Sequence, residues 1–328
     1  MIITKTPFRI SFVGGGSDLE AFYSQTPGAV LSTTIDKYMY ISSHQFFEEN
    51  KIRAKYADTE TVDSLEDLKH PIIRETFKKF NINGGLEVSS IADIPSGTGM
   101  GSSSSFTVGL FHNLYTYKGQ FASKKTLAED ACHMEIDTLK EPIGKQDQYA
   151  AAYGGLNIIR FLSNGKTTVE PIYLNEDSYN KLQNNLILFY IGSERKASDI
   201  LGTQKKALGE KEKHETVKEM VKLVDELKDT LYSGNIDDFG KLLHENWLLK
   251  QKISTKISSP EIQELYQTAM NNGALGGKLL GAGGGGFMLF YCKKEDQNAL
   301  INAMPCRQFE FSFENEGSKL IYYGGDYG

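Results

Sequence analysis

Three glycines and five serines are concentrated in residues 93–105, Asp-Ile-Pro-Ser-Gly-Thr-Gly-Met-Gly-Ser-Ser-Ser-Ser. Glycine lets a backbone approach a ligand closely, and a helix that begins after such a turn offers unpaired N–H groups to an anion. Serine hydroxyls can bind an oxygen or a hard cation. The stretch therefore predicts a phosphate-binding loop.

Two better-known glycine loops do not fit these residues. A P-loop requires lysine where the chain has Ser102, and a dinucleotide fingerprint requires glycine where Ser104 stands. A flexible connector is the alternative. It is disfavoured because residues 85–91, which are typical of a strand, lead directly into the loop, and residues 106–114, which are typical of a helix, directly follow it.

A second polar group follows residues 2–13, whose alternation around Pro7 is typical of edge strands. Arg9 lies on this predicted strand, and Gly14-Gly-Gly-Ser-Asp18 follows it. The group therefore combines a cation, a hydroxyl and a carboxylate, which suits a polyhydroxylated ligand, although a plain turn is the alternative.

Two carboxylates follow in the chain. Residues 123–139 predict a helix on which Glu135 interrupts an apolar face. A buried glutamate needs a cation partner, and the sequence leaves open whether this is a basic side chain or a metal ion. Asp147 then stands beside the apolar run 149–155.

Earlier in the chain, residues 38–42 and 51–56 predict an antiparallel hairpin.

The composition turns polar at residues 175–180, and we place a domain boundary between residues 183 and 184. The apolar strand 186–191 then leads into Ser193, Arg195, Lys196 and Ser198 at the start of a helical stretch. An anion site and a charged, solvated helix start explain these four residues equally well.

The glycine run 281–286 matches a dinucleotide fingerprint at Gly281, Gly283 and Gly286. The residues that follow it, 287–292, predict a strand, whereas the fingerprint requires a helix, so we reject that interpretation. The run instead allows another backbone, or a loop that holds a ligand, to lie flush against it.

The composition restricts the classes of partner that the protein is expected to bind. A net charge of −6 over 328 residues provides no basic field for nucleic acid or anionic lipid. No apolar run approaches the roughly 20 residues of a membrane span, so we expect a cytoplasmic protein. The three cysteines show no metal spacing, and we expect reduced core thiols.

Three blocks together resemble the signature of the galactokinase, homoserine, mevalonate and phosphomevalonate kinase (GHMP kinase) superfamily. They are Pro7-Phe-Arg9 with Gly14 and Asp18, residues 95–103, and residues 281–286. The resemblance implies an α+β fold of two domains, 1–183 and 184–328. The first would be similar to domain 2 of ribosomal protein S5 and the second would be ferredoxin-like, with ATP and substrate between them.

The resemblance also implies roles for individual residues. Asp147 would be the catalytic base, paired with Arg9, and Ser102 or Ser103 would hold Mg²⁺ together with Glu135. The ATP phosphates would contact Pro95, Ser96, Gly97, Thr98, Gly99, Met100, Gly101, Ser102, Ser103 and Ser104. We expect the substrate to contact Gly15, Gly16, Ser17, Asp18, Ser193, Arg195, Lys196, Gly283 and Gly284.

Within the superfamily, the chain is similar to bacterial D-glycero-D-manno-heptose 7-phosphate kinases, which phosphorylate the anomeric (C1) hydroxyl to give a 1,7-bisphosphate for nucleotide-activated heptose and surface glycans. Gly14-Gly-Gly-Ser-Asp18 departs from the galactokinase pattern. The alternatives are a fucokinase-like neutral-sugar kinase, an isoprenoid kinase or decarboxylase, and a catalytically silent sugar sensor. The expected partners are ATP and a small sugar phosphate, with neither nucleic acid nor membrane, and a homodimer is left open.

Overall fold

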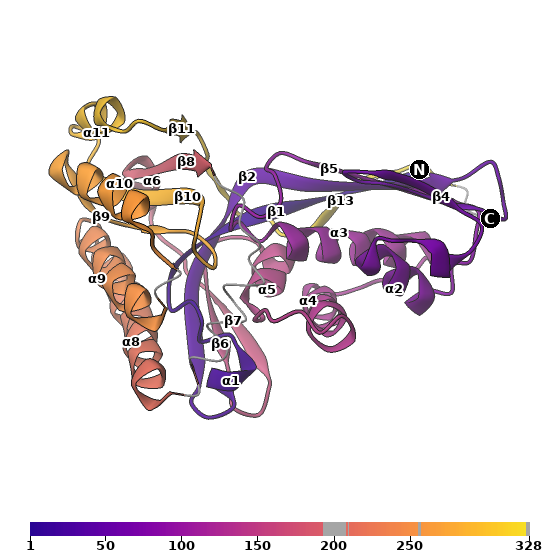
Figure 1. The fold of residues 1–328 in the computed structure, drawn as a ribbon, viewed down its shortest axis with the longest axis horizontal. Helices are drawn as coiled ribbons and strands as arrows, with labels where there is room; N and C mark the ends of the chain where they lie inside the picture. The colour runs from indigo at the N-terminus through magenta and orange to yellow at the C-terminus, as the bar shows by residue number, and fades with distance from the viewer. Residues whose placement is uncertain (193–207, 209, 255–256, 326–328) are drawn as a thin grey trace.

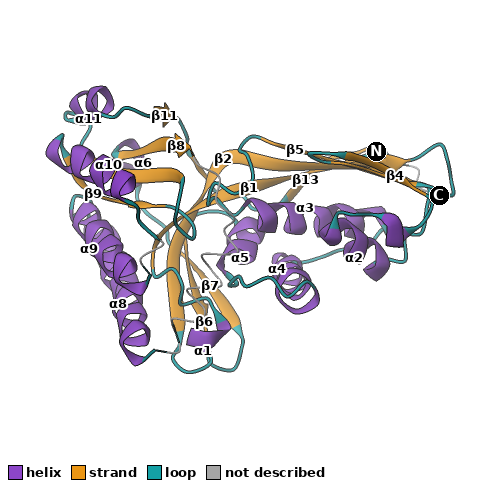
Figure 2. Cartoon of the chain, viewed as in Figure 1, coloured by secondary structure: helices purple, strands orange, loops and turns teal. Residues whose placement is uncertain are grey.

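The structure, a computed structural model, describes residues 1–192, 208, 210–254 and 257–325. Two β-sheets organise these residues (Figures 1 and 2). The larger sheet has nine strands: β1 (Ile2–Val13), β2 (Gly28–Gln45), β3 (Ile52–Lys55), β4 (Thr59–Val62), β5 (Leu86–Ala92), β6 (Asn157–Phe161), β7 (Thr167–Pro171), β12 (Phe313–Glu314) and β13 (Lys319–Tyr323). The smaller has four: β8 (Leu186–Gly192), β9 (Ala274–Leu279), β10 (Gly286–Cys292) and β11 (Arg307–Phe309).

The helices divide between the two sheets (Figure 1). One face of the larger sheet carries α2 (Pro71–Lys79), α3 (Ser102–Tyr117), α4 (Lys124–Cys132) and α5 (Gln146–Tyr153). With the smaller sheet lie α6 (Glu176–Asn184), α9 (Asp238–Ile253), α10 (Pro260–Asn271) and α11 (Gln297–Ala303), while α8 (Lys211–Ser233) packs against α9 and against β1 and β2 of the larger sheet. A short helix, α1 (Glu20–Tyr23), follows the first turn, and a π-helical segment, His133–Thr138, continues α4.

The pairing of β1 corrects the sequence prediction of an edge strand. β1 lies between β13 and β2 in the order β13-β1-β2-β5-β3-β4. Pro7 is tolerated because β13 pairs only with residues 2–5 and the register with β2 shifts between Pro7 and Phe8. The N–H group that proline lacks is therefore not needed by β13.

The predicted hairpin is also wrong. β5 lies between β2 and β3, pairing antiparallel with β2 and parallel with β3. β3 instead forms its antiparallel pair with β4. The alternation of apolar residues identified both strands, but it carries no information about which strand lies beside which.

The end of the chain returns to the larger sheet. β11 belongs to the smaller sheet, whereas β12 pairs with β2 and β13 pairs with β1. The smaller sheet begins with β8, two residues beyond the end of α6. The predicted boundary between residues 183 and 184 falls within α6 and stays a prediction.

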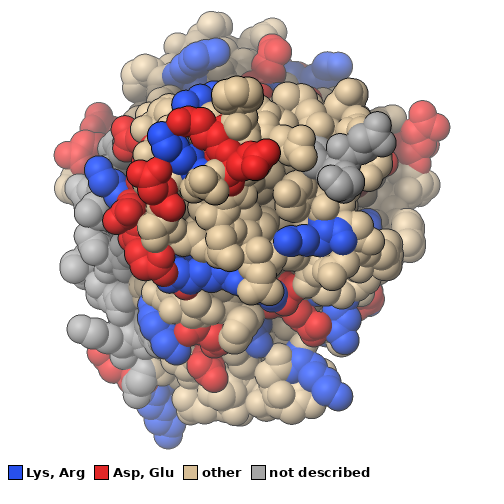
Figure 3. All heavy atoms as spheres, turned by 90° about the vertical axis from the view of Figure 1, so that its right-hand side faces the viewer, with Lys and Arg blue, Asp and Glu red and all other residues tan. Residues whose placement is uncertain are grey.

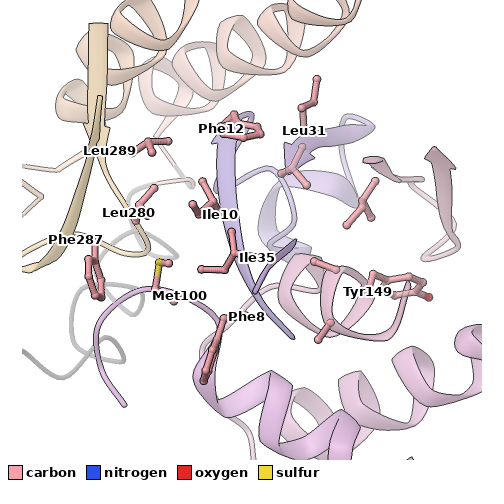
Figure 4. Packing of buried hydrophobic residues seen from close by; sticks show 14 of the residues in the cluster. Phe8, Ile10, Phe12, Leu31, Ile35, Met100, Tyr149, Leu280, Phe287 and Leu289 are labelled. Atoms are coloured by element: carbon pink, nitrogen blue, oxygen red, sulfur yellow. The ribbon is translucent and has the colours of Figure 1, made fainter. Parts of the chain in front are cut away.

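One hydrophobic core joins the two sheets (Figure 4). Phe12 on β1 packs edge-on against Phe239 on α9, with ring centroids 5.0 Å apart. Met100, from the glycine- and serine-rich loop, is fully buried close to Phe287 of β10. The loop is thus held between the sheets by its own apolar side chain.

Outside this core, the charged side chains on the surface and the cysteines show no unusual arrangement among the described residues. Acidic and basic side chains are interspersed on the face drawn in Figure 3. The three cysteines are free, with Cys132 and Cys292 buried and Cys306 partly buried. Among the described residues, no helix combines the length and the apolar character needed to cross a membrane.

Candidate active site

A cleft of about 180 Å³ lies where the two sheets meet. Its wall combines the end of β1, the turn after it, the loop before α3, the first residues of α5, and parts of α9 and the β9–β10 connection. Arg9, Asp18, Gly101 and Asp147 are among its lining residues. The structure therefore brings together side chains that the sequence separates by more than a hundred positions.

Arg9 and Asp147 form a two-pronged ion pair in this cleft. Arg9 Nε donates to Asp147 Oδ1 at 2.7 Å and Nη2 donates to Oδ2 at 2.8 Å, while Nη1 donates to the Gly99 carbonyl at 2.6 Å. Arg9 is 4% exposed, whereas the Asp147 side chain is 24% exposed. The guanidinium thus fixes both the loop and the carboxylate, and the more exposed carboxylate has the greater access to the cleft.

The loop before α3 has the conformation that its glycines allow. Gly97, Gly99 and Gly101 all have φ between 77° and 81°, and α3 begins immediately after Gly101. A Cβ at Gly101 would lie 3.3 Å from both Arg9 Cγ and Asp147 Oδ2. The first N–H groups of α3 have no helical carbonyl to bind, so the loop presents an anion site beside the ion pair.

The other predicted loop residues differ in their positions: some lie outside the cleft and others line it. Thr98 is buried, and its Oγ1 donates to the Pro95 carbonyl at 2.9 Å. Ser96 is exposed. Ser102, Ser103 and Ser104 line the cleft from the first turn of α3.

Glu135 is fully buried in the π-helical segment, and the predicted neighbour Ser103 is one of its partners. Its carboxylate accepts hydrogen bonds from Ser103 Oγ at 2.6 Å, Ser104 Oγ at 2.9 Å and Gln148 Nε2 at 2.7 Å. In the described part of the chain no basic side chain pairs with it, which corrects that half of the expectation. Burial raises the pKa of Glu135 to about 7, and the three donors oppose the rise.

Asp18 also lines the cleft, close enough to Asp147 for the two charges to interact. Its Oδ1 accepts from the Gly16 N–H at 3.1 Å and its Oδ2 accepts from the Gln146 N–H at 3.3 Å. Burial and the nearby charge of Asp147 raise the pKa of Asp18 to about 6. Gly144 is required here because a Cβ would lie 1.9 Å from Asp18 Oδ2.

The neighbours of Asp18 separate into two groups. Gly15 and Gly16 line the cleft, and a Cβ at either would meet no atom within 4 Å. Ser17 is fully buried and is not among the residues that line the cleft; the single proton of its Oγ has two acceptors within reach, the carbonyls of Gly14 and Ala29 at 2.7 and 3.0 Å. Ser17 therefore holds the turn, and the predicted contact with a substrate is not what its geometry provides.

The last glycine block packs backbone to backbone against the loop. A Cβ at Gly281 would lie 2.4 Å from Gly99 Cα, and one at Gly286 would lie 2.3 Å from the Thr98 carbonyl oxygen. Gly283 and Gly284 do not line the cleft; a Cβ at Gly283 would meet Ile257 at 2.9 Å, and the Gly284 N–H donates to the Ile257 carbonyl at 3.2 Å. The run thus positions the loop through Gly281 and Gly286, while Gly283 and Gly284 pack against Ile257.

The anion site predicted from Ser193, Arg195, Lys196 and Ser198 lies outside the described residues. The sequence analysis missed other residues that the structure places in the cleft, chiefly Lys250 and Lys278. Lys250 shares the buried face of α9 with Asn246, Trp247 and Ile253. A charged residue on an apolar helix face was the signal that identified Glu135, and it would have identified Lys250 as well.

Comparisons with known proteins identify the family of this chain. The family model "GHMP kinases N terminal domain" matches residues 68–155, and "GHMP kinases C terminal" matches residues 220–310. The D-glycero-alpha-D-manno-heptose 7-phosphate kinase of Campylobacter jejuni is 29% identical over 336 residues, covering 97% of this chain and 98% of that relative. The galactokinase of Pyrococcus furiosus is 25% identical, covering 92% of each chain.

A solved structure shows the same fold. The crystal structure of a D-glycero-D-manno-heptose 1-phosphate kinase from Bacteroides thetaiotaomicron has a TM-score of 0.80 at 21% identity, covering 99% of this chain and 100% of that chain. The family models and the sugar-kinase relatives define the chain as a phosphotransferase. The chain belongs to the GHMP kinase family, and the α+β fold with an N-terminal and a C-terminal kinase domain is confirmed.

Proposed function

We propose that this kinase transfers the terminal phosphate of ATP to the anomeric hydroxyl of D-glycero-D-manno-heptose 7-phosphate, giving the 1,7-bisphosphate. The observation that carries the proposal is the ion pair of Arg9 and Asp147 beside the glycine-rich loop, which sets a carboxylate next to an anion site. The choice of sugar is supported by the similarity to the Campylobacter jejuni heptose 7-phosphate kinase along the whole chain. The proposed substrates, ATP and a sugar phosphate, are cytoplasmic metabolites, so we place the reaction in the cytoplasm.

Asp147 accepts the proton of the attacking hydroxyl in this proposal. Its two oxygens are held by Arg9, and it stands in the first turn of α5, where the helix dipole stabilises a negative charge. An anomeric hydroxyl is acidic for an alcohol, so a carboxylate suffices as the acceptor. Arg9 orients that carboxylate and places positive charge where charge develops on the reacting oxygens.

The loop before α3 binds the nucleotide phosphates through backbone N–H groups. The contact of Gly281 with Gly99 holds this loop against the second sheet, so the phosphate site is formed by both halves of the chain. This arrangement suits phosphoryl transfer, because the reaction depends on positioning and charge neutralisation rather than on covalent chemistry by the protein.

The residues around Glu135 fit Mg²⁺. Hard cations prefer oxygen ligands, and Mg²⁺ is commonly held by one or two carboxylates together with substrate phosphates. Glu135 and the hydroxyls of Ser103 and Ser104 supply such oxygens, with Ser102 on the same turn. Gln148 Oε1 is buried without a hydrogen-bond partner in the described part of the chain. When bound, Mg²⁺ would neutralise charge on the nucleotide phosphates.

An ADP-release assay tests the proposal across heptose 7-phosphate, L-fucose, galactose and mevalonate. We expect heptose 7-phosphate to give the highest kcat/KM, and phosphorus NMR of the product to show a phosphate ester at C1. A preference for fucose or galactose would replace this substrate with a neutral sugar. A product phosphorylated elsewhere than C1 would overturn the assignment of the anomeric hydroxyl.

A further inference from the structure

Two lysines lie buried in the wall of the cleft, and the proposed chemistry uses neither of them. Lys250 on α9 is 6% exposed and Lys278 on β9 is 2% exposed, and both line the cleft. Burying an ammonium group is costly unless an anion or several acceptors compensate for the lost water. The groups that contact the two ammonium groups therefore show whether their positive charge is compensated.

Both ammonium groups contact only backbone carbonyls among the described residues. Lys278 Nζ donates to the carbonyls of Ser11 and Phe12 at 2.7 and 2.8 Å, and Lys250 Nζ donates to that of Gly281 at 2.5 Å. An ammonium group has three donors, so each lysine retains at least one N–H beyond these contacts. Neither forms an ion pair with a carboxylate in the described part of the chain.

The carboxylates of the cleft are engaged elsewhere. Asp147 is bound by Arg9, and Asp18 by the N–H groups of Gly16 and Gln146. Burial, and then the charge of Arg9, lower the pKa of Lys250 to about 8, although Asp18 opposes the change. Burial, followed by the charges of Lys250 and Arg9, also lowers the pKa of Lys278. Burial and the neighbouring positive charges therefore both disfavour the charged forms of the two lysines, and no carboxylate pairs with either in the described part of the chain.

Ser11 provides an independent observation. Its side chain is 5% exposed and lines the same cleft, and its Oγ has no hydrogen-bond partner in the described part of the chain. Its carbonyl is one of the two that hold Lys278. A buried hydroxyl without a partner is uncommon in a folded protein and indicates a missing ligand atom.

We infer that Lys250, Lys278 and Ser11 form an anion subsite in the cleft that binds a phosphate group. Two ammonium groups and a hydroxyl match the charge and the several oxygens of a phosphate, whereas a neutral sugar hydroxyl would leave the positive charges uncompensated. This inference rests on the proposed function, which supplies two sources for the phosphate. They are the sugar's own 7-phosphate and the terminal phosphate of the nucleotide.

Titration calorimetry without Mg²⁺ separates these sources. The ligands are heptose 7-phosphate, unphosphorylated heptose, ADP and a non-hydrolysable ATP analogue. Lys250→Met should raise the Kd of one phosphate-bearing ligand by about tenfold or more, as expected for a lost charged hydrogen bond. The Kd of unphosphorylated heptose should change by less than about twofold. A loss confined to heptose 7-phosphate assigns the sugar's phosphate, and a loss for the ATP analogue but not ADP assigns the terminal phosphate.

Matched variants guard against a folding defect. Lys252→Gln removes a positive charge from the exposed side of α9 and should leave every Kd unchanged. Ser11→Ala removes only a hydroxyl that has no partner, so it should keep the wild-type melting temperature and weaken the same ligand as Lys250→Met. Lys250→Arg, which keeps the charge, should retain part of the affinity.

The inference is overturned if Lys250→Met and Ser11→Ala, both folded, leave the Kd of every phosphate-bearing ligand unchanged, or if they weaken unphosphorylated heptose equally. The proposed function fails separately. If the wild-type protein does not bind heptose 7-phosphate but both variants weaken the ATP analogue, the subsite stands and the choice of sugar falls.

Discussion

Two pairs of charged side chains line the cleft, Arg9 with Asp147 and Lys250 with Lys278, and their charges are compensated differently. Arg9 and Asp147 neutralise each other through two hydrogen bonds, and Arg9 has a third partner in the Gly99 carbonyl. Lys250 and Lys278 have carbonyl partners alone among the described residues. The charges of the first pair are compensated before any ligand binds, as expected for a positioned proton acceptor. The second is completed only by an anion, as a binding subsite should be.

The largest effect should come from removing the carboxylate of the Arg9–Asp147 pair. Asp147→Asn removes the proton acceptor but keeps its size, so we expect kcat to fall by roughly 10²–10⁴, with nucleotide affinity nearly intact. Steady-state kinetics and nucleotide titration measure the two effects. Asp137→Asn is the matched control, since Asp137 is 63% exposed. Unchanged turnover in Asp147→Asn would remove this residue from the mechanism.

The backbone contact between Gly99 and Gly281 gives the next largest effect. The carbonyls of these two glycines hold Arg9 and Lys250. Gly281 has a φ of 70°, and a Cβ there would lie 2.4 Å from Gly99 Cα, so Gly281→Ala must displace the loop. We expect a loss of about 3 kcal/mol in the free energy of unfolding, from steric overlap and backbone strain together. Gly234→Ala controls for strain alone, because Gly234 has a φ of 79° and open space around it. Equal losses in urea denaturation would show that the Gly281–Gly99 contact contributes nothing.

Glu135 tests whether a buried carboxylate with neutral donors also serves a cation. Glu135→Gln should lower kcat/KM by about tenfold at limiting Mg²⁺, and the defect should shrink as Mg²⁺ is raised. The matched variant is Glu129→Gln on the exposed side of α4, where the side chain is 54% exposed. If Glu135→Gln lowers the melting temperature but leaves the Mg²⁺ dependence of the rate unaltered, Glu135 is structural.

The smallest effect concerns Asp18, whose charge acts on both Asp147 and Lys250. Its pKa is raised to about 6 in the folded chain, above the roughly 3.9 of an unfolded aspartate. The folded state therefore holds this proton more tightly, and its ionisation costs stability as the pH rises from about 4 to about 6. Asp18→Asn should then stabilise the fold by about 1 kcal/mol near pH 7, because the amide oxygen replaces only part of the hydrogen bonding, and by less near pH 4.

Thermal melting at the two pH values measures this difference. A gain in melting temperature that is the same at both would show that the ionisation of Asp18 is not its cause. Binding of the sugar should weaken in the same variant, since Asp18 lines the cleft.

The sequence by itself determined the chemical groups and the local elements. The loop at residues 93–105 could be recognised because glycine conformation and helix starts depend on neighbouring residues. Arg9, Asp18, Glu135 and Asp147 stood out for a similar reason, each being a polar residue in a local apolar or glycine-rich pattern.

Tertiary structure decided which elements meet. β5 separates β2 from β3, and β13 turns β1 into an inner strand, because pairing depends on surfaces far apart in the chain. Glu135 finds hydroxyls and an amide rather than a basic side chain, because α3 and α5 deliver them at that place. Lys250 and Lys278 become cleft residues only when α9 and β9 pack against the end of β1, since burial of a charge is a property of the assembled chain.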